Sequence, residues 1–167
     1  MTARYTADEI FALSQKNWPE THHSVHKYVL YFHRLRDIVV IEMNEFIKQF
    51  GLSIAEFDVL ATLRSSSFPY VLKPSELQSS TLLSSGGLTK LLYQLEAREL
   101  IKRSIVKEDK RSKLVHLTAK GKALIETSRD AVMMKEKERL DDALSNDELN
   151  QLTKLLGKLL NVVENRL

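Results

Sequence analysis

The chain has 167 residues, of which 43% are hydrophobic and 28% charged, and its formal net charge is +3. It contains no cysteine, which excludes disulfides, thiol redox chemistry and thiolate metal sites. No apolar run is long enough to cross a bilayer, and the first residues, MTARYTADEIF, carry acids where a signal peptide needs an apolar core, so we expect a cytoplasmic protein.

The first fifty residues predict two helices. A short helix over residues 6–17 begins at a capping box formed by Thr6 and Glu9. Apolar residues then recur at helical spacing over residues 24–49, which predicts a long helix. Gly51 follows it and is the residue type that ends helices in a left-handed conformation.

The next segment predicts a helix, a short strand and a second helix. Ser53 and Glu56 are spaced as a capping box, so a helix is expected to begin at Ile54 and continue to about Ser66. Val71–Leu72 follows as a very short strand. Pro74 suits the first position of a short helix over residues 74–80.

A third helix of this segment is strongly amphipathic. Four leucines stand at positions i, i+3, i+4 and i+7 and form one buried stripe: Leu88, Leu91, Leu92 and Leu95. Gly86, Lys90 and Tyr93 fall on the opposite side, with Thr89 on the flank. Small and polar groups therefore face outward.

The start of this amphipathic helix has two interpretations. Ser84 or Ser85 can act as the N-cap by accepting a hydrogen bond from a free helix N–H. Gly86 and Gly87 then lie in the first turn, where missing side chains let the backbone approach a binding partner closely. Alternatively, the helix begins at Leu88 and the glycines form a turn.

After Leu100 the periodicity changes from helical to alternating. Residues 101–106 alternate as a strand, residues 107–112 form a charged tip, and residues 114–117 return as a second strand. A helix that leads directly into a basic-tipped hairpin is typical of a recognition helix and its wing.

Charge is concentrated in the same stretch. Residues 84–122 contain ten cations and four anions, a local balance of +6, whereas the whole chain carries only +3. Such a concentration is where a polyanion would bind. A solvated hairpin with ordinary lysines is the alternative, but the coincidence of charge with the helix-hairpin pattern favours nucleic-acid binding.

The C-terminal part predicts two more helices. Thr118 caps a long helix that continues to about Leu144, and Ser145 and Glu148 form a capping box for the last helix. That helix carries a heptad-like apolar stripe, which includes Leu149, Leu152, Leu155, Leu156, Leu159, Leu160 and Val163. Such faces have no partner inside a minimal wing domain, which predicts a helical interface between two copies of the chain.

These elements predict a mainly α protein with a small β wing, in which a winged helix-turn-helix domain is joined to a helical dimerisation region. We divide the chain into an N-terminal helical extension (1–20), a long dimerisation or linking helix (21–50), a winged helix-turn-helix DNA-binding domain (51–118) and C-terminal dimerisation helices (119–167).

The run SSGGLTKLLYQLEARELIKRSIVKEDKRSKLVHLTAKGKALI resembles the MarR family of bacterial transcription regulators. The similarity includes LTKLLYQLE, the D-x-R wing motif of Asp109 and Arg111, and V-x-L-T-x-x-G over residues 115–121. GLSIAEFDVLATL and LKPSELQ match the preceding helices of that family, and the match extends over residues 25–167.

The resemblance implies a homodimer, more often a repressor than an activator, on a pseudo-palindromic operator of double-stranded DNA. One recognition helix would enter each of two major-groove segments spaced by ~10 base pairs. Arg111, oriented by Asp109, would reach a flanking minor groove. The candidate DNA-contacting residues are Ser75, Ser84, Ser85, Gly86, Gly87, Thr89, Lys90, Tyr93, Arg103, Lys107, Asp109, Lys110 and Arg111.

The resemblance also implies release from DNA by a small aromatic or acidic effector. Trp18 and Asp58 resemble the branch of the family that responds to urate or phenolic compounds, with Lys90 and Lys102 where that branch has arginines. Candidate ligand-binding residues are Trp18, His33, Asp58 and Lys102. The alternative is that Trp18 anchors the extra helix and Asp58 pairs with a nearby cation. Another branch senses peroxide through cysteine, which this chain lacks.

Glu99 departs from the family, which usually has glycine directly after the recognition helix. A left-handed conformation would strain a glutamate by about 1 kcal/mol, so the helix is expected to end differently.

Other chemistry is weakly represented. His22, His23 and His26 have a spacing that could hold a metal, but we interpret them as solvated residues at a helix start and expect no metal or cofactor. No catalytic motif occurs, so an enzyme is not expected. The alternatives are a metal-responsive regulator that uses the three histidines, and a ligand-sensing or protein-interaction module that kept the fold without binding DNA.

Overall fold

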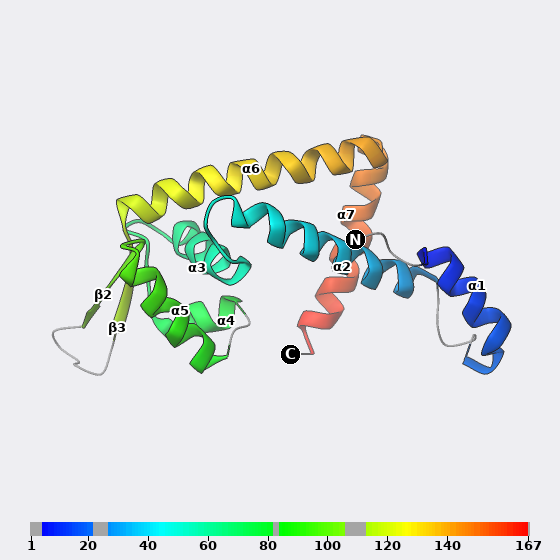
Figure 1. Cartoon of the computed structure of the whole chain (residues 1–167), viewed down its shortest axis with the longest axis horizontal. Coiled ribbons are helices and arrows are strands. Elements are labelled where there is room, and N and C mark those ends of the chain that lie inside the picture. The colour runs from blue at the N-terminus through cyan, green and yellow to red at the C-terminus, as the bar shows by residue number, and fades with distance from the viewer. Residues whose placement is uncertain (1–4, 22–26, 82–83, 106–112, 167) are drawn as a thin grey trace. The chain divides into compact units, whose positions relative to one another are not determined.

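The computed structural model describes residues 5–21, 27–81, 84–105 and 113–166. The chain divides into two compact units, Met1–Ile54 and Ala55–Leu167. Most elements are helices, and a three-stranded antiparallel sheet is the β component (Figure 1). The predicted mainly α fold with a small β wing is confirmed.

The first unit consists of the short helix α1 (Ala7–Asn17), a 3-10 turn η1 (Pro19–Thr21) and the long helix α2 (Lys27–Lys48). The predicted capping box begins α1: the Thr6 hydroxyl accepts from the Glu9 N–H at 3.2 Å, and the Glu9 carboxylate accepts from the Thr6 N–H at 2.7 Å. Asp8 ties α1 to α2, because its carboxylate accepts from the Tyr31 hydroxyl at 2.6 Å and pairs with Lys27.

Gly51 follows α2 with a φ of 67°. Its left-handed conformation is the one expected of a glycine that ends a helix. The predicted start of the long helix at about Ser24 lies outside the described residues.

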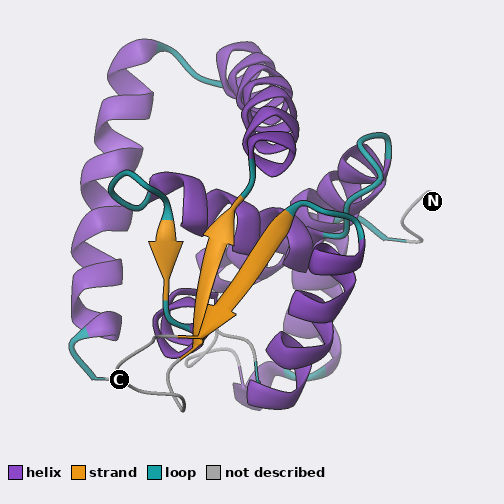
Figure 2. Cartoon of the chain, turned by 90° about the vertical axis from the view of Figure 1, so that its left-hand side faces the viewer, coloured by secondary structure: helices purple, strands orange, loops and turns teal. Residues whose placement is uncertain are grey.

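The second unit contains three helices, the sheet and two further helices. Their bounds are α3 (Ile54–Ser65), β1 (Val71–Leu72), α4 (Pro74–Thr81), α5 (Ser85–Ala97), β2 (Ile101–Ile105), β3 (Lys113–Leu117), α6 (Ala119–Ala143) and α7 (Asn146–Glu164). The strands lie in the order β1-β3-β2, with β3 in the centre (Figure 2). Val115 of β3 pairs with Leu72 on one side and with Arg103 on the other.

The core of this unit explains why α5 is firmly held. All four leucines of the predicted stripe are buried, together with apolar residues of α3, α4 and the sheet: Leu60, Leu63, Leu77, Leu88, Leu91, Leu92, Leu95, Ile101 and Val115. Burying a leucine side chain contributes about 1.5–3 kcal/mol. The inner face of α5 is thus fixed, and its outer face is left exposed.

The two last helices begin as predicted. The Thr118 hydroxyl caps α6 by accepting from the Gly121 N–H at 3.0 Å, and Ser145 and Glu148 form the capping box of α7. No side chain of α7 is buried. Most of its apolar residues, among them Leu155 at 63% and Leu159 at 55% exposure, face solvent. Within the described residues, no helix is both long enough and apolar enough to span a membrane.

Candidate nucleic-acid interface

Helix α5 begins at Ser85, and Ser84 is its N-cap, since the Ser84 hydroxyl accepts from the Gly87 N–H at 3.2 Å. Gly86 and Gly87 therefore lie in the first turn, and the interpretation in which they form a turn before Leu88 is wrong. A Cβ at Gly86 would meet nothing within 4 Å. Packing within the described part of the chain therefore does not demand glycine at this position.

The exposed face of α5 is open to solvent. The residues that share it are Ser85, Gly86, Thr89, Lys90, Tyr93 and Gln94. Five of these six are candidate DNA-contacting residues from the sequence, and Gln94 was missed. Its position, four residues after Lys90 on the outward side, was the available signal. A glutamine amide can bond an adenine edge through two hydrogen bonds.

Lys90 is the cation of this face. Its side chain is exposed, and within the described part of the chain it has no ion-pair partner. Ser75 is exposed in the first turn of α4. Of the remaining candidates, Lys107, Asp109, Lys110 and Arg111 lie outside the described residues, so their assignment stays a prediction.

Arg103 differs from Lys90, because its guanidinium is bound inside the unit. The carboxylate of Glu96 accepts from Arg103 Nε at 2.7 Å, from its Nη2, and from its backbone N–H at 3.0 Å. The guanidinium also lies over the ring of Tyr93, 3.9 Å from the ring centroid. Hydrogen bonds from Arg103 lower the pKa of Glu96, and the same bonds raise the pKa of Arg103.

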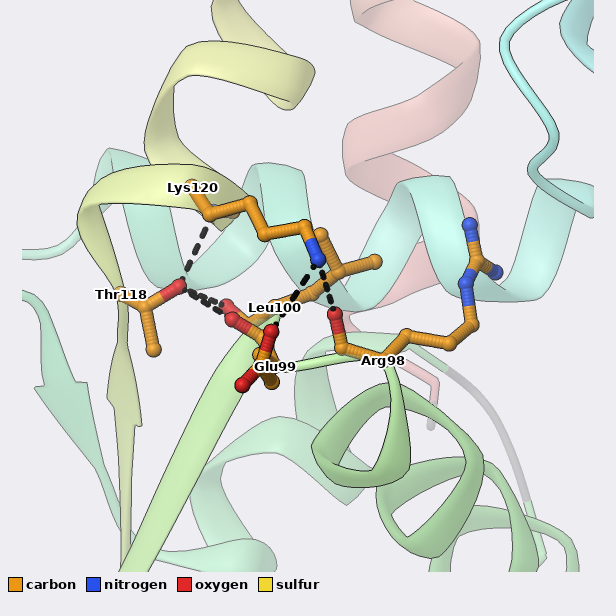
Figure 3. A network of polar contacts seen from close by, with 6 residues as sticks. Arg98, Glu99, Leu100, Thr118 and Lys120 are labelled. Atoms are coloured by element: carbon orange, nitrogen blue, oxygen red, sulfur yellow. Dashed lines mark hydrogen bonds and ion pairs between the residues drawn. The ribbon is translucent and has the colours of Figure 1, made fainter.

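The C-terminal end of α5 is held by residues at the start of α6 (Figure 3). Arg98 is the C-cap, and Glu99 follows with a φ of 60°. The helix therefore keeps the left-handed position despite the glutamate, and the expectation that it ends differently is wrong. Lys120 Nζ donates to the Arg98 carbonyl at 2.9 Å and pairs with the Glu99 carboxylate at 3.4 Å. The Thr118 hydroxyl lies 2.8 Å from the Glu99 carbonyl oxygen.

A second polar contact joins the C-terminal end of α5 to α3. Glu56, of which 12% of the side chain is exposed, accepts from Arg98 Nη1 at 2.9 Å. Helix α5 is thus fixed at its C-terminal end by polar contacts and along its length by leucines. Such rigid support is what a reading surface requires.

The candidate ligand residues belong to different units. Trp18 and His33 are exposed in the first, while Asp58 and Lys102 belong to the second, so their assignment to one site remains a prediction. Asp58 lines a hollow of about 640 Å³ together with Thr62, Ser65 and Arg129, among others, and Lys102 is not among the lining residues. Within the described residues Asp58 has no ion-pair partner, and the protein atoms around its carboxyl raise its pKa.

No cluster of metal-ligating residues occurs in the described ranges. His22, His23 and His26 fall outside those ranges, so the metal-responsive alternative remains a prediction.

Known proteins resemble this chain in both sequence and structure. The family model described as transcriptional regulator SarA/Rot matches residues 42–127. The HTH-type transcriptional regulator PecS of Dickeya dadantii is 32% identical over 117 residues, which cover 70% of each chain. The multiple antibiotic resistance protein MarR of Escherichia coli is 30% identical over 118 residues, which cover 71% of this chain and 80% of MarR.

Two solved structures of Escherichia coli MarR share the fold. The wild-type apo form has a TM-score of 0.68 at 28% identity and covers 78% of this chain and 93% of that chain. The C80S mutant complexed with operator DNA has a TM-score of 0.67 at 26% identity, and the match covers 89% of this chain and 98% of that chain.

Helix α5 is anchored by leucines, has a polar outer face and is followed by a β-hairpin. Together with the similarities to known proteins, these features define a winged helix-turn-helix regulator of transcription that binds DNA. It is not an enzyme. The chain belongs to the MarR family of such regulators, which confirms the resemblance carried by its sequence.

Proposed function

We propose that this regulator acts as a homodimeric repressor on a pseudo-palindromic operator and that a small aromatic or acidic compound releases it. The observation that carries the proposal is the outer face of α5, where hydroxyls, an amide, a cation and a bare glycine backbone share one surface. A major groove admits a helix with such a face, and base edges are read by these groups. Escherichia coli MarR, a relative, has been crystallised with operator DNA.

The apolar face of α7 supports the homodimer. Its leucines and valines from Leu152 onward are exposed, at 38% for Leu152 and more for the later ones, and such a contiguous stripe is typical of a protein-protein interface. A second copy offers the same stripe, so a two-fold arrangement would cover both. Two recognition helices related in this way suit half-sites spaced by ~10 base pairs.

The hollow at Asp58 supports effector binding. Its lining includes the hydroxyl-bearing residues Thr62, Ser65 and Ser80 together with Asp58 and Arg129. An arginine fork pairs with a carboxylate, and hydroxyls and Asp58 can bond phenolic groups. Benzoate and phenol are therefore suitable test compounds. If calorimetry detects no binding of either compound, and neither compound changes the affinity of the protein for its operator, the proposed release by such an effector is wrong.

The operator can be tested by selection of duplexes from a randomised pool with the full-length protein. We expect enrichment of an inverted repeat whose half-site centres are ~10 base pairs apart. Enrichment of a single half-site would contradict a two-fold dimer on DNA. No enrichment would instead favour the module that kept the fold without binding DNA.

A further inference from the structure

Arg103 was predicted as a DNA contact, but its surroundings give it another role. Its side chain is only 19% exposed. Two N–H groups of its guanidinium, on Nε and Nη2, donate to the same carboxylate oxygen of Glu96, and its face covers the ring of Tyr93 at 3.9 Å. The backbone N–H of Arg103 donates to the same carboxylate at 3.0 Å. One acidic side chain of α5 therefore holds both the backbone and the side chain of a residue in β2.

In this arrangement the positive charge of Arg103 is neutralised by the carboxylate of Glu96 within the same chain. A paired arginine and carboxylate are together neutral, so the pair adds nothing to the positive potential that attracts phosphates. Moving the guanidinium to a phosphate would leave the Glu96 carboxylate without its two-pronged partner. Lys90, exposed on the same helix and without an ion-pair partner in the described ranges, has no such competitor.

Tyr93 connects the pair to the reading surface. Tyr93 is 57% exposed and lies on the outer α5 face with Thr89 and Lys90. It also lines a hollow, about 240 Å³ in volume, at the base of the wing with Glu96 and Arg103. A ring packed on one face by a fixed guanidinium loses little rotational freedom when it meets a ligand.

We infer that Glu96 and Arg103 are positioning residues, which fix Tyr93 and the base of the wing for operator recognition, and that Arg103 makes no phosphate contact. The inference rests on the proposed DNA-binding function. In this view the Glu96–Arg103 pair contributes to discrimination between DNA sequences. Free cations such as Lys90 contribute the general attraction to DNA.

The test compares variants on two duplexes over a range of salt concentrations: the duplex selected by the wild-type protein, and poly(dI–dC) as non-specific DNA. Arg103→Lys keeps the charge but loses the planar fork and the stacking. The double variant E96Q/R103Q removes the pair without changing net charge. Lys90→Gln is the matched control, and circular dichroism melting checks that each variant folds.

We expect Arg103→Lys and E96Q/R103Q to lose about tenfold in affinity for the selected duplex. Their affinity for poly(dI–dC), and the slope of log affinity against log salt, should stay at the wild-type values. Lys90→Gln should weaken binding to both duplexes and reduce the slope by about 0.9.

A slope that falls by about 0.9 in E96Q/R103Q would make Arg103 a phosphate contact and overturn the inference. Wild-type affinity of Arg103→Lys for the selected duplex would overturn it as well. A second measurement needs no variant: the Nε–H NMR signal of Arg103 should keep its position when the wild-type protein binds the selected duplex, and a large displacement would contradict the pairing. Failure of the wild-type protein to bind either duplex overturns the proposed function itself, and the inference with it.

Discussion

Single residues set the conformation at the end of the recognition helix. Glu99 occupies a left-handed position with a φ of 60°, which costs a residue with a Cβ about 1 kcal/mol. The Thr118 hydroxyl donates to the Glu99 carbonyl oxygen and holds the backbone in place, whereas the ion pair of the Glu99 carboxylate with Lys120 is exposed and contributes little. The sequence identified this position as unusual, but it could not identify these contacts, because they come from residues nineteen and twenty-one positions later.

Replacing Glu99 with glycine should raise the free energy of unfolding by about 0.5–1 kcal/mol, since glycine adopts the conformation without strain. Glu99→Ala is the matched control, because it loses the same exposed ion pair but keeps the Cβ. Urea unfolding measures both variants. Equal stability of the glycine and alanine variants would show that the left-handed backbone is not strained.

Asp58 should make stability depend on pH. Its pKa in the folded chain is raised by the surrounding protein atoms, so the folded state binds a proton more readily than the unfolded state. A contribution to the free energy of unfolding is therefore lost as pH rises from the ordinary carboxyl pKa through the raised one. The Asp58→Asn side chain does not titrate, so the stability of this variant does not fall with rising pH for this reason.

We expect the stability of Asp58→Asn relative to wild type to increase between about pH 4 and about pH 7. Glu96→Gln should show the opposite trend, because the pKa of Glu96 is lowered in the folded chain. Urea unfolding at both pH values measures the two differences. A pH-independent difference for Asp58→Asn would contradict an effect of its surroundings.

Elements were predictable where local rules decide them. The leucine stripe of α5, the capping boxes at Thr6 and Ser145 and the cap at Thr118 all depend on residues close in sequence, and the structure confirms them. The Glu96–Arg103 pair and the ring contact to Tyr93 depend on how β2 turns back along α5. Spacing alone does not specify that path, so the sequence predicts Arg103 as a DNA contact and gives no sign of its pairing with Glu96.

The contact between α6 and the chain after α5 depends on one glycine. A Cβ on Gly121 would lie 2.0 Å from the carbonyl oxygen of Leu100, and a backbone atom cannot move aside as a flexible side chain could. Gly121→Ala should therefore lower the free energy of unfolding by about 2 kcal/mol or more. Gly86→Ala is the control, since its Cβ meets nothing, and it should stabilise α5 by about 0.5–1 kcal/mol. Denaturant unfolding measures the stability of both variants. A Gly121→Ala variant as stable as wild type would contradict the close contact with Leu100.

At the scale of the whole molecule, the apolar face of α7 is the surface on which the proposed dimer depends. Leu155 and Leu159 are exposed, so replacing both with glutamate should not disturb the fold of one chain but should disrupt the proposed dimer. Light scattering after gel filtration should report a monomer with unchanged helicity. K154E/K158E introduces as many glutamates on the same helix and should remain a dimer. A dimeric L155E/L159E variant would place the interface elsewhere.

The proposed function requires that the outer face of α5 reads bases in two symmetric half-sites. Selection of duplexes from a randomised pool with the variant T89A/Q94A tests this most directly, because base-reading side chains set the preference at particular positions. Preference should be lost at the same positions in both half-sites, while the rest of the selected sequence is retained. Selection of an unchanged sequence by this variant would contradict base reading by this face.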